Sequence, residues 1–390
     1  MFSARTRWAR SPNAVTLALR QRPEGPALLD LTEANPTRVD LAFPPELSHA
    51  LLQLSTPMVH TYTPSPFGLD SAREAVAGYY GSRGLAVDPG RVLLTASTSE
   101  AYGWLFKLLC DPGDEVLVPQ PSYPLFEDLA TLEGVRVVPV PHRWTGFRWE
   151  LDPDELERAV SPRTRAVLVV HPNNPTGALL DGDALGALTS VCARRGLALV
   201  CDEVFGDYLL APRRGAVGSL ATHREVLTFT LSGLSKVVCQ PQLKLGWVVV
   251  SGPEEAVTEA LARLELLADC YLSVGAPVMA AAPALLGARE AVQSVVLARL
   301  RRNLAALRAA LGAGSPWTAL PVEAGWYAVL RVPRTRPEED RVCALVRDEG
   351  VLVSPGYFFE LPADGYLVLS LLPREEVFDE GLRRALRHAE

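Results

Sequence analysis

Short hydrophobic runs alternate with amphipathic segments along the middle of the chain. Each run is rich in Val and Leu and is bounded by turn-forming residues. The segments between several of them, such as 99–110 and 183–195, have the length and spacing of helices. Strands that are apolar throughout and separated by helices favour a parallel sheet covered on both faces. The predicted strands lie at 91–97, 114–120, 135–141, 165–172, 197–204, 226–233 and 246–252.

The remaining pattern predicts helices and a second, smaller sheet. A helix is predicted to start after Asp152, whose side chain can cap it. Pro153 takes the first helical position and Glu155 supplies an acid at the third. A helical stretch covers about 254–311, with a break around 273–277, and apolar runs follow at 322–332, 350–356 and 366–372.

We therefore predict an α/β protein with two domains. The large domain has a mostly parallel seven-stranded sheet between helices, and the smaller domain is α+β. The predicted division is an N-terminal segment contributing to the small domain (1–45), the large domain (46–275) and the small C-terminal domain (276–390).

Composition and charge narrow the class of protein. A net charge of −7 with 48% hydrophobic residues is typical of a globular enzyme and argues against nucleic-acid binding. The six cysteines form no Cys-x-x-Cys pair and the six histidines lack ligand spacing, so no metal is expected. The N-terminus lacks an apolar signal core, and no run is long enough to span a membrane. We expect a cytoplasmic protein.

Lysine is unusually rare in this chain. Of 38 basic residues, only Lys107, Lys236 and Lys244 are lysines, and two of these lie within nine residues. An amine can lose its proton and form a covalent bond, whereas a guanidinium cannot. Lys236 and Lys244 are therefore candidates for a chemical role.

Four motifs follow predicted strands, where ligands bind in open α/β sheets. Ser97, Thr98 and Ser99 open a helix and suit a phosphate group, although an ordinary helix cap is the simpler explanation because such caps are common. Tyr123 follows the second strand and could stack on a planar ring, although a core tyrosine is the simpler explanation.

The other two motifs carry an amide and a carboxylate. Asn174 lies in "HPNNPTG", which is either a plain turn or a turn whose amide binds a cofactor. Asp202 ends an apolar strand, and a buried carboxylate needs a partner, either a protonated ring nitrogen or a structural Arg or His.

Taken together and in order, these motifs with Lys236 resemble the class I and II aminotransferases, pyridoxal 5′-phosphate enzymes of fold type I. The resemblance runs from "LTEANPT" (31–37) to "YLVLSLL" (366–372). It implies a homodimer that moves an amino group from an amino acid to a 2-oxo acid.

The resemblance also implies a role for each matching residue. Lys236 matches the Schiff-base lysine, Asp202 the partner of the pyridine nitrogen, Asn174 the partner of the ring oxygen O3′, and Tyr123 the stacked aromatic. Candidate phosphate contacts are Ser97, Thr98, Ser99, Ser235 and Lys244, with Tyr62 reaching the phosphate in the neighbouring subunit.

Three positions depart from the family pattern. Lys244 stands where an arginine is usual, and Phe205 replaces a tyrosine, which removes one donor to O3′ and predicts a more basic Schiff base. Val368 stands where an arginine usually holds the substrate carboxylate. Arg38 is the candidate substitute, although a solvated surface arginine explains it equally well.

Two alternatives remain open at the level of sequence. One is a lyase, such as a carbon–sulfur β-lyase, or a decarboxylase on the same fold, because fold and cofactor do not fix the reaction. The other is a non-catalytic cofactor-binding protein.

Overall fold

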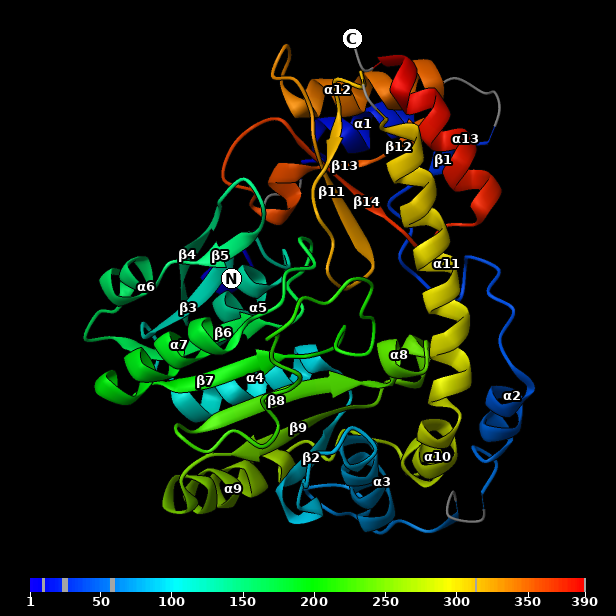
Figure 1. Ribbon diagram of the computed structural model, residues 1–390. Helices are drawn as coiled ribbons and strands as arrows, with labels where there is room; N and C mark the ends of the chain where they lie inside the picture. The colour runs from blue at the N-terminus through cyan, green and yellow to red at the C-terminus, as the bar shows by residue number, and fades with distance from the viewer. Residues whose placement is uncertain (9–10, 23–26, 57–59, 313, 389–390) are drawn as a thin grey trace.

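The computed structural model describes residues 1–390 except 9–10, 23–26, 57–59, 313 and 389–390. Within these residues the main sheet has eight strands in the order β2-β9-β8-β7-β6-β3-β4-β5 (Figure 1). They are β2 (Val92–Thr95), β3 (Glu115–Gln120), β4 (Arg136–Trp144), β5 (Trp149–Leu151), β6 (Thr164–Val170), β7 (Ala198–Asp202), β8 (Thr228–Gly233) and β9 (Gly246–Ser251).

All seven predicted strands are present, and the sheet is mostly parallel as expected. Strands β4, β3, β6, β7 and β8 run parallel to one another, while β9 is antiparallel to both β8 and β2. The eighth strand, β5, is a short antiparallel partner of β4 that the hydrophobic pattern did not reveal. The main sheet therefore has one strand more than the seven that the sequence predicted.

Helices cover both faces of the sheet because the strands are apolar on both faces. In β7, Val200 packs in a cluster that includes residues of α4 and α9, whereas Leu199 packs on the opposite face against residues of α7. The helices are α1 (Ala14–Gln21), α2 (Pro45–Leu52), α3 (Asp70–Gly81), α4 (Thr98–Leu109), α5 (Phe126–Glu133), α6 (Pro153–Ala159), α7 (Gly182–Arg195), α8 (Leu234–Val237), α9 (Glu254–Asp269), α10 (Ala276–Gly287), α11 (Arg289–Ala310), α12 (Glu338–Ala344) and α13 (Glu375–Ala385).

Local sequence accounts for several helix ends. Asp152 caps α6 as predicted, with its carboxylate accepting a hydrogen bond from the backbone N–H of Asp154. Asp181 caps α7, which ends at Gly196 in the left-handed conformation. The long helical stretch is broken between α9 and α10, as predicted, and again at Ala288 between α10 and α11.

A second sheet lies at the far end of α11, which runs from α10 towards α12 and α13 (Figure 1). Its order is β10-β11-β14-β13, and its neighbouring strands are antiparallel. A two-stranded sheet joins β1 to β12, so the N-terminal segment pairs with the C-terminal part of the chain. These strands are β1 (Leu29–Asp30), β10 (Thr318–Ala319), β11 (Tyr327–Arg331), β12 (Val351–Leu352), β13 (Ser354–Pro355) and β14 (Tyr366–Ser370).

The loop after β6 is joined to the segment before β11 by a close backbone contact. The N–H of Ala324 donates a hydrogen bond to the carbonyl of Gly177 at 3.1 Å. Gly177 has a φ of +69°, and a Cβ added there would lie 2.3 Å from the carbonyl oxygen of Ala324. Only glycine fits this position without a shift of the backbone.

We therefore expect Gly177→Ala to lower the free energy of unfolding by about 3 kcal/mol, because the new methyl group collides with a backbone oxygen at a positive φ. Gly186→Ala is the matched control, because Gly186 lies inside α7 with no atom within 4 Å of an added Cβ. That change should raise stability by up to about 1 kcal/mol. Urea unfolding of both variants tests the pair, and a Gly177→Ala protein as stable as wild type would contradict the assignment.

Candidate active site

A cavity of about 240 Å³ lies beyond the carboxyl ends of β6, β7 and β8. Nine of the candidate site residues from the sequence line it, together with Phe205, although they come from separate segments of the chain. The nine candidates are Ser97, Thr98, Ser99, Tyr123, Asn174, Asp202, Ser235, Lys236 and Lys244. The parallel register explains this convergence, since the carboxyl ends of parallel strands meet at one edge of the sheet.

Lys236 lies on α8, the short helical turn that follows β8. The residue is half-buried, and removal of its amine from water lowers the pKa of that amine, while the nearby Cys239 and Asp202 act in the opposite direction. The Nζ atom lies 4.5 Å from the ring centroid of Trp326 and 5.5 Å from that of Phe205. A lysine whose pKa is lowered by burial is more readily available as a neutral nucleophile.

Asp202 ends β7 and faces the same cavity. Its carboxylate accepts hydrogen bonds from the hydroxyl of Tyr102 and from the backbone N–H of Val204, both at 3.0 Å. Burial raises the pKa of Asp202 to about 6, even though these two donors and Lys236 lower it. A cation placed beside this carboxylate would therefore be strongly favoured.

Asn174 follows β6 in the turn that the sequence predicted. The turn is built by its neighbour Asn173, whose amide donates to the carbonyl of Pro121 and accepts from the hydroxyl of Thr176. The Asn174 Oδ1 atom is buried and has no hydrogen-bond partner among the described residues. The amide of Asn174 therefore has bonding capacity left for a bound group.

The N-terminus of α4 forms one wall of the cavity. The hydroxyl of Ser97 caps the helix by accepting from the N–H of Glu100 at 3.2 Å, and Glu100 in turn accepts from the N–H of Ala96. Thr98 and Ser99 occupy the first two helical positions, where backbone N–H groups have no intrahelical acceptor. This arrangement suits a phosphate, because the helix dipole and the free N–H groups both attract an anion.

Ser235 and Lys244 add a hydroxyl and an amine to the cavity lining. Lys244 has a φ of +52°, in the left-handed region that favours glycine. A lysine here costs backbone strain that glycine would avoid, and residues under such strain cluster at functional sites. The amine is the group that lysine adds at this position.

Three residues discussed in the sequence do not line the cavity. Tyr62 is 82% exposed and lies in a groove with Trp104 and Met279, and Arg38 is exposed and outside the cavity lining. Val368 is buried and pairs with Val329 across β14 and β11, within an apolar cluster. The position where an arginine is usual in the resembling family is therefore part of a hydrophobic core.

The structure adds residues to the site that the sequence did not indicate. Phe126 and Tyr327 line the cavity, Trp326 contacts Lys236, and Tyr102 binds Asp202. Trp326 and Tyr327 lie within the apolar run at 322–332, and nothing in the run itself indicates a site. Only the packing of the second sheet against the first brings them to Lys236.

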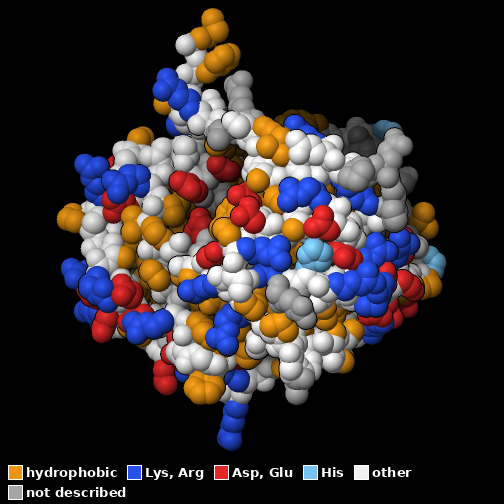
Figure 2. Space-filling view, turned by 90° about the horizontal axis from the view of Figure 1, so that it is seen from above, with side chains coloured by type: hydrophobic (Ala, Val, Ile, Leu, Met, Phe, Trp, Pro, Cys, Tyr) orange, Lys and Arg blue, Asp and Glu red, His pale blue; other side chains and the backbone are white. Residues whose placement is uncertain are grey.

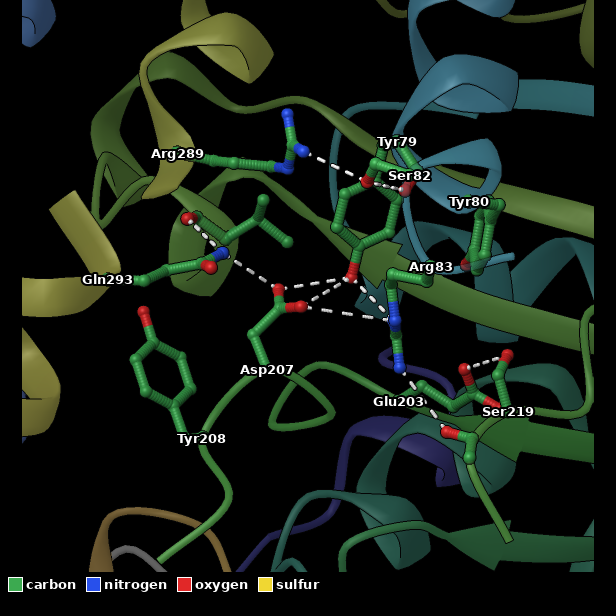
Figure 3. A network of polar contacts seen from close by, with 12 residues as sticks. Tyr79, Tyr80, Ser82, Arg83, Glu203, Asp207, Tyr208, Ser219, Arg289 and Gln293 are labelled. Carbon is green, nitrogen blue, oxygen red and sulfur yellow. Dashed lines mark hydrogen bonds and ion pairs between the residues drawn. The ribbon is translucent and has the colours of Figure 1, made fainter. Parts of the chain in front are cut away.

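A buried polar network supports the segments that carry Asp202 and Lys236 (Figure 3). The amide of Gln293 donates to the Asp207 carboxylate at 2.9 Å and to the carbonyl of Val237 at 3.0 Å. Tyr208 donates from its hydroxyl to the carbonyl of Lys236 at 2.5 Å. Two backbone carbonyls of α8 are thus held by side chains from other elements, which fixes the turn that carries the lysine.

Comparison with known proteins identifies the family. The model for "Aminotransferase class I and II" matches residues 28–380. An alanine aminotransferase of Mycobacterium tuberculosis is 30% identical over 378 residues, which cover 91% of this chain and 84% of that protein. A glutamate-pyruvate aminotransferase of Haemophilus influenzae is 31% identical over 285 residues, covering 72% of this chain and 69% of that protein.

Solved structures agree with this finding. An aspartate aminotransferase of Thermus thermophilus superposes with a TM-score of 0.84 at 26% identity, covering all of this chain and 99% of that one. An alanine aminotransferase of Pyrococcus furiosus gives a TM-score of 0.88 at 24% identity, which supports the fold, and covers 99% of both chains. The chain belongs to the class I and II aminotransferase family.

It is therefore a pyridoxal-phosphate-dependent aminotransferase with the type I fold, which confirms the resemblance seen in the sequence. The comparisons favour transamination over the lyase, decarboxylase and non-catalytic alternatives. The cavity also fits the cofactor chemically. It combines an amine, a buried carboxylate, an unpartnered amide and a helix N-terminus, which match an aldehyde, a ring nitrogen, a ring oxygen and a phosphate.

The raised pKa of Asp202 predicts a pH dependence of stability in the cofactor-free protein. Burial raises the folded-state pKa of Asp202 from its ordinary value of 3.8 to about 6, so the folded state favours the protonated acid. Relative to Asp202→Asn, the wild type should therefore lose on the order of 3 kcal/mol of stability as pH rises from about 3 to about 7.

Urea unfolding midpoints of wild type and Asp202→Asn across this range measure the difference. Glu203, whose pKa burial raises to about 7, is present in both proteins, so its effect cancels in the comparison. A stability difference that does not vary with pH would show that Asp202 is not a desolvated acid.

Proposed function

We propose that Lys236 is the Schiff-base lysine of this aminotransferase. The observation that supports the proposal most strongly is the convergence of Lys236, Asp202 and Asn174 on one cavity, although they follow three different strands. Pyridoxal 5′-phosphate, once bound, supplies an electron sink that makes a proton on the carbon next to the amino group acidic.

The remaining residues hold and orient this cofactor in the proposal. Asp202 would keep the ring nitrogen protonated, because a buried carboxylate with a raised pKa favours a cation beside it. Asn174 would donate from its Nδ2 group to the ring oxygen, and Tyr123 would stack on the ring. The phosphate would lie at the N-terminus of α4, with Ser97 capping the helix and with contacts from Thr98, Ser99, Ser235 and Lys244.

We propose a small 2-amino acid as donor and a 2-oxo acid as acceptor, in line with the alanine and glutamate-pyruvate activities named for the relatives. Both acids carry a carboxylate, yet the cationic side chains among the described lining residues are Lys236 and Lys244. Because Val368 is apolar and buried, another cation has to bind the carboxylate. Arg38, which is exposed, is our candidate.

We further propose a homodimer in which Tyr62 reaches the cofactor phosphate of the neighbouring subunit. The side chain of Tyr62 is 82% exposed and lies at a groove that includes Trp104, Leu272 and Met279. A second subunit commonly covers a surface of this kind.

The domain division at residues 45 and 275 also remains part of the proposal.

A cytoplasmic location completes the proposal. Its support is the set of six cysteines, none of which is in a disulfide. Among the described residues, no helix has both the length and the apolar character needed to cross a membrane. The face seen in Figure 2 mixes acidic and basic side chains instead of gathering one sign of charge.

The Lys236 assignment is tested by the visible absorption of the purified protein. We expect added pyridoxal 5′-phosphate to give a yellow band, which an amino acid donor removes and a 2-oxo acid restores. Lys236→Arg should lose the protein-bound band and at least about a thousandfold of the turnover, since a guanidinium cannot form the covalent bond. Lys107→Arg is the matched control because Lys107 lies on α4 in an ion pair with Glu133, and it should behave as wild type. A normal band in Lys236→Arg would refute the assignment.

The Arg38 assignment is tested with Arg38→Ala. If Arg38 binds the substrate carboxylate, the variant should keep the cofactor band but raise KM for the amino acid by about tenfold to a hundredfold, which is the loss of one charge-assisted contact. Arg20→Ala, on α1, serves as a control for the removal of another arginine from the N-terminal segment. Unchanged kinetics in Arg38→Ala would show that a different cation binds the carboxylate.

A further inference from the structure

Two aromatic rings flank the amine of Lys236. Nζ lies 4.5 Å from the ring centroid of Trp326 and 5.5 Å from that of Phe205, both within the range of a cation–π contact. The two rings pack edge to face with their centroids 5.5 Å apart. In the described part of the chain, Nζ makes no hydrogen bond, so the two rings can stabilise its charge alongside Cys239 and Asp202.

Both rings are held firmly. Trp326 is fully buried, and its carbonyl accepts a hydrogen bond from the N–H of Leu371 at 2.7 Å. The ring of Tyr208 packs against Trp326 with centroids 5.1 Å apart, and its hydroxyl binds the carbonyl of Lys236. The same group of aromatic side chains therefore contacts the lysine at its backbone and at its amine.

An aromatic face has a property that a carboxylate lacks. It stabilises an ammonium group through its quadrupole but cannot accept the proton, so the lysine remains able to give that proton back. The other titratable or charged groups around the amine are Asp202, Cys239, Tyr208, Tyr123, Tyr327 and Lys244. Of these, Asp202 is already engaged by two donors and is the proposed partner of the ring nitrogen.

We propose that Trp326, assisted by Phe205, is a positioning residue for the amine of Lys236 while that amine is not bonded to the cofactor. The rings hold the ammonium form during proton transfer. The neutral amine would take up a proton from the substrate, carry it as an ammonium and give it up again, so the lysine would end unchanged. The inference rests on the proposed role of Lys236.

The scarcity of lysine makes a direct test practical. With only three lysines in the chain, ¹³Cε-labelled lysine gives three side-chain signals, which Lys236→Arg, Lys244→Arg and Lys107→Arg assign. The full-length holoenzyme is converted to its pyridoxamine 5′-phosphate form, in which the lysine amine is free. The ε-proton shifts and their pH titration are then measured by NMR.

We expect the Lys236 ε-protons of the wild type to be shifted upfield, because they lie over an aromatic face. In Trp326→Leu this shift should disappear, and the titration midpoint should fall by about one pH unit, a tenfold weaker affinity for the proton. Trp326→Phe should keep part of both effects, because a smaller ring still offers a face. Phe205→Leu should reduce them less than Trp326→Leu, since its ring is farther from Nζ.

Trp317→Leu is the matched control. Trp317 is also a buried tryptophan of the same core cluster, but its cationic neighbour is Arg341, at 5.9 Å. The control should lose comparable stability and leave the Lys236 signal unchanged. A change in the Lys236 signal of equal size in Trp317→Leu would mean a general loosening of the core and would overturn the proposal.

The proposal is also overturned if the wild-type Lys236 signal has no upfield shift, or if Trp326→Leu keeps the wild-type shift and midpoint. Should Trp326→Leu not fold, the wild type and Trp326→Phe decide the question on their own. Failure of the proposed function is a separate result: the Lys236 signal would then not respond when the cofactor is changed between its aldehyde and amino forms.

Discussion

The parallel alignment of β6, β7 and β8 is the constraint on which the site depends. Asp202 pairs with Val170 on one side and with Leu231 on the other. Asn174 follows β6, Asp202 ends β7 and Lys236 follows β8, so the parallel register leaves all three at the same edge of the sheet. A shift of one residue in β7 would turn Asp202 to the opposite face and separate it from the cavity.

Burial of acidic groups next to this edge is costly and is offset by hydrogen bonds. Burial raises the pKa values of Asp202, Glu203 and Asp207. Glu203 accepts from the hydroxyl of Ser219 and the N–H of Leu220, and Asp207 accepts from Tyr79 and Gln293 (Figure 3). These bonds make the segment after β7 rigid, so Phe205 and Tyr208 keep fixed positions around Lys236.

The substrate side of the cavity differs in character from the cofactor side. Most polar groups of the lining lie on the strand-end loops, on α8 and at the start of α4. There the lysines and the helix N-terminus would neutralise a phosphate, and Asp202 would neutralise a protonated ring. The second sheet contributes Tyr327 to the lining, and behind it Val368 lies in an apolar cluster with Trp149 and Phe359. A carboxylate-binding cation is therefore not built into this strand, and specificity has to come from another segment.

The sequence by itself determined seven strands of the main sheet, their mostly parallel arrangement and about half of the residues that line the cavity. Apolar runs, turn residues and the rare lysines are local signals, and parallel pairing follows from helices between strands. The sequence did not reveal β5, because three residues carry too little pattern, or the break at Ala288, where the helical spacing continues.

Only the tertiary structure decided which residues surround the amine of Lys236. Trp326 and Tyr327 are about 90 positions away along the chain and look like ordinary members of an apolar strand. The structure also showed that Val368 packs in a core. The physical reason is the same in each case: the role of a side chain depends on contacts between distant segments, and local sequence does not encode these contacts.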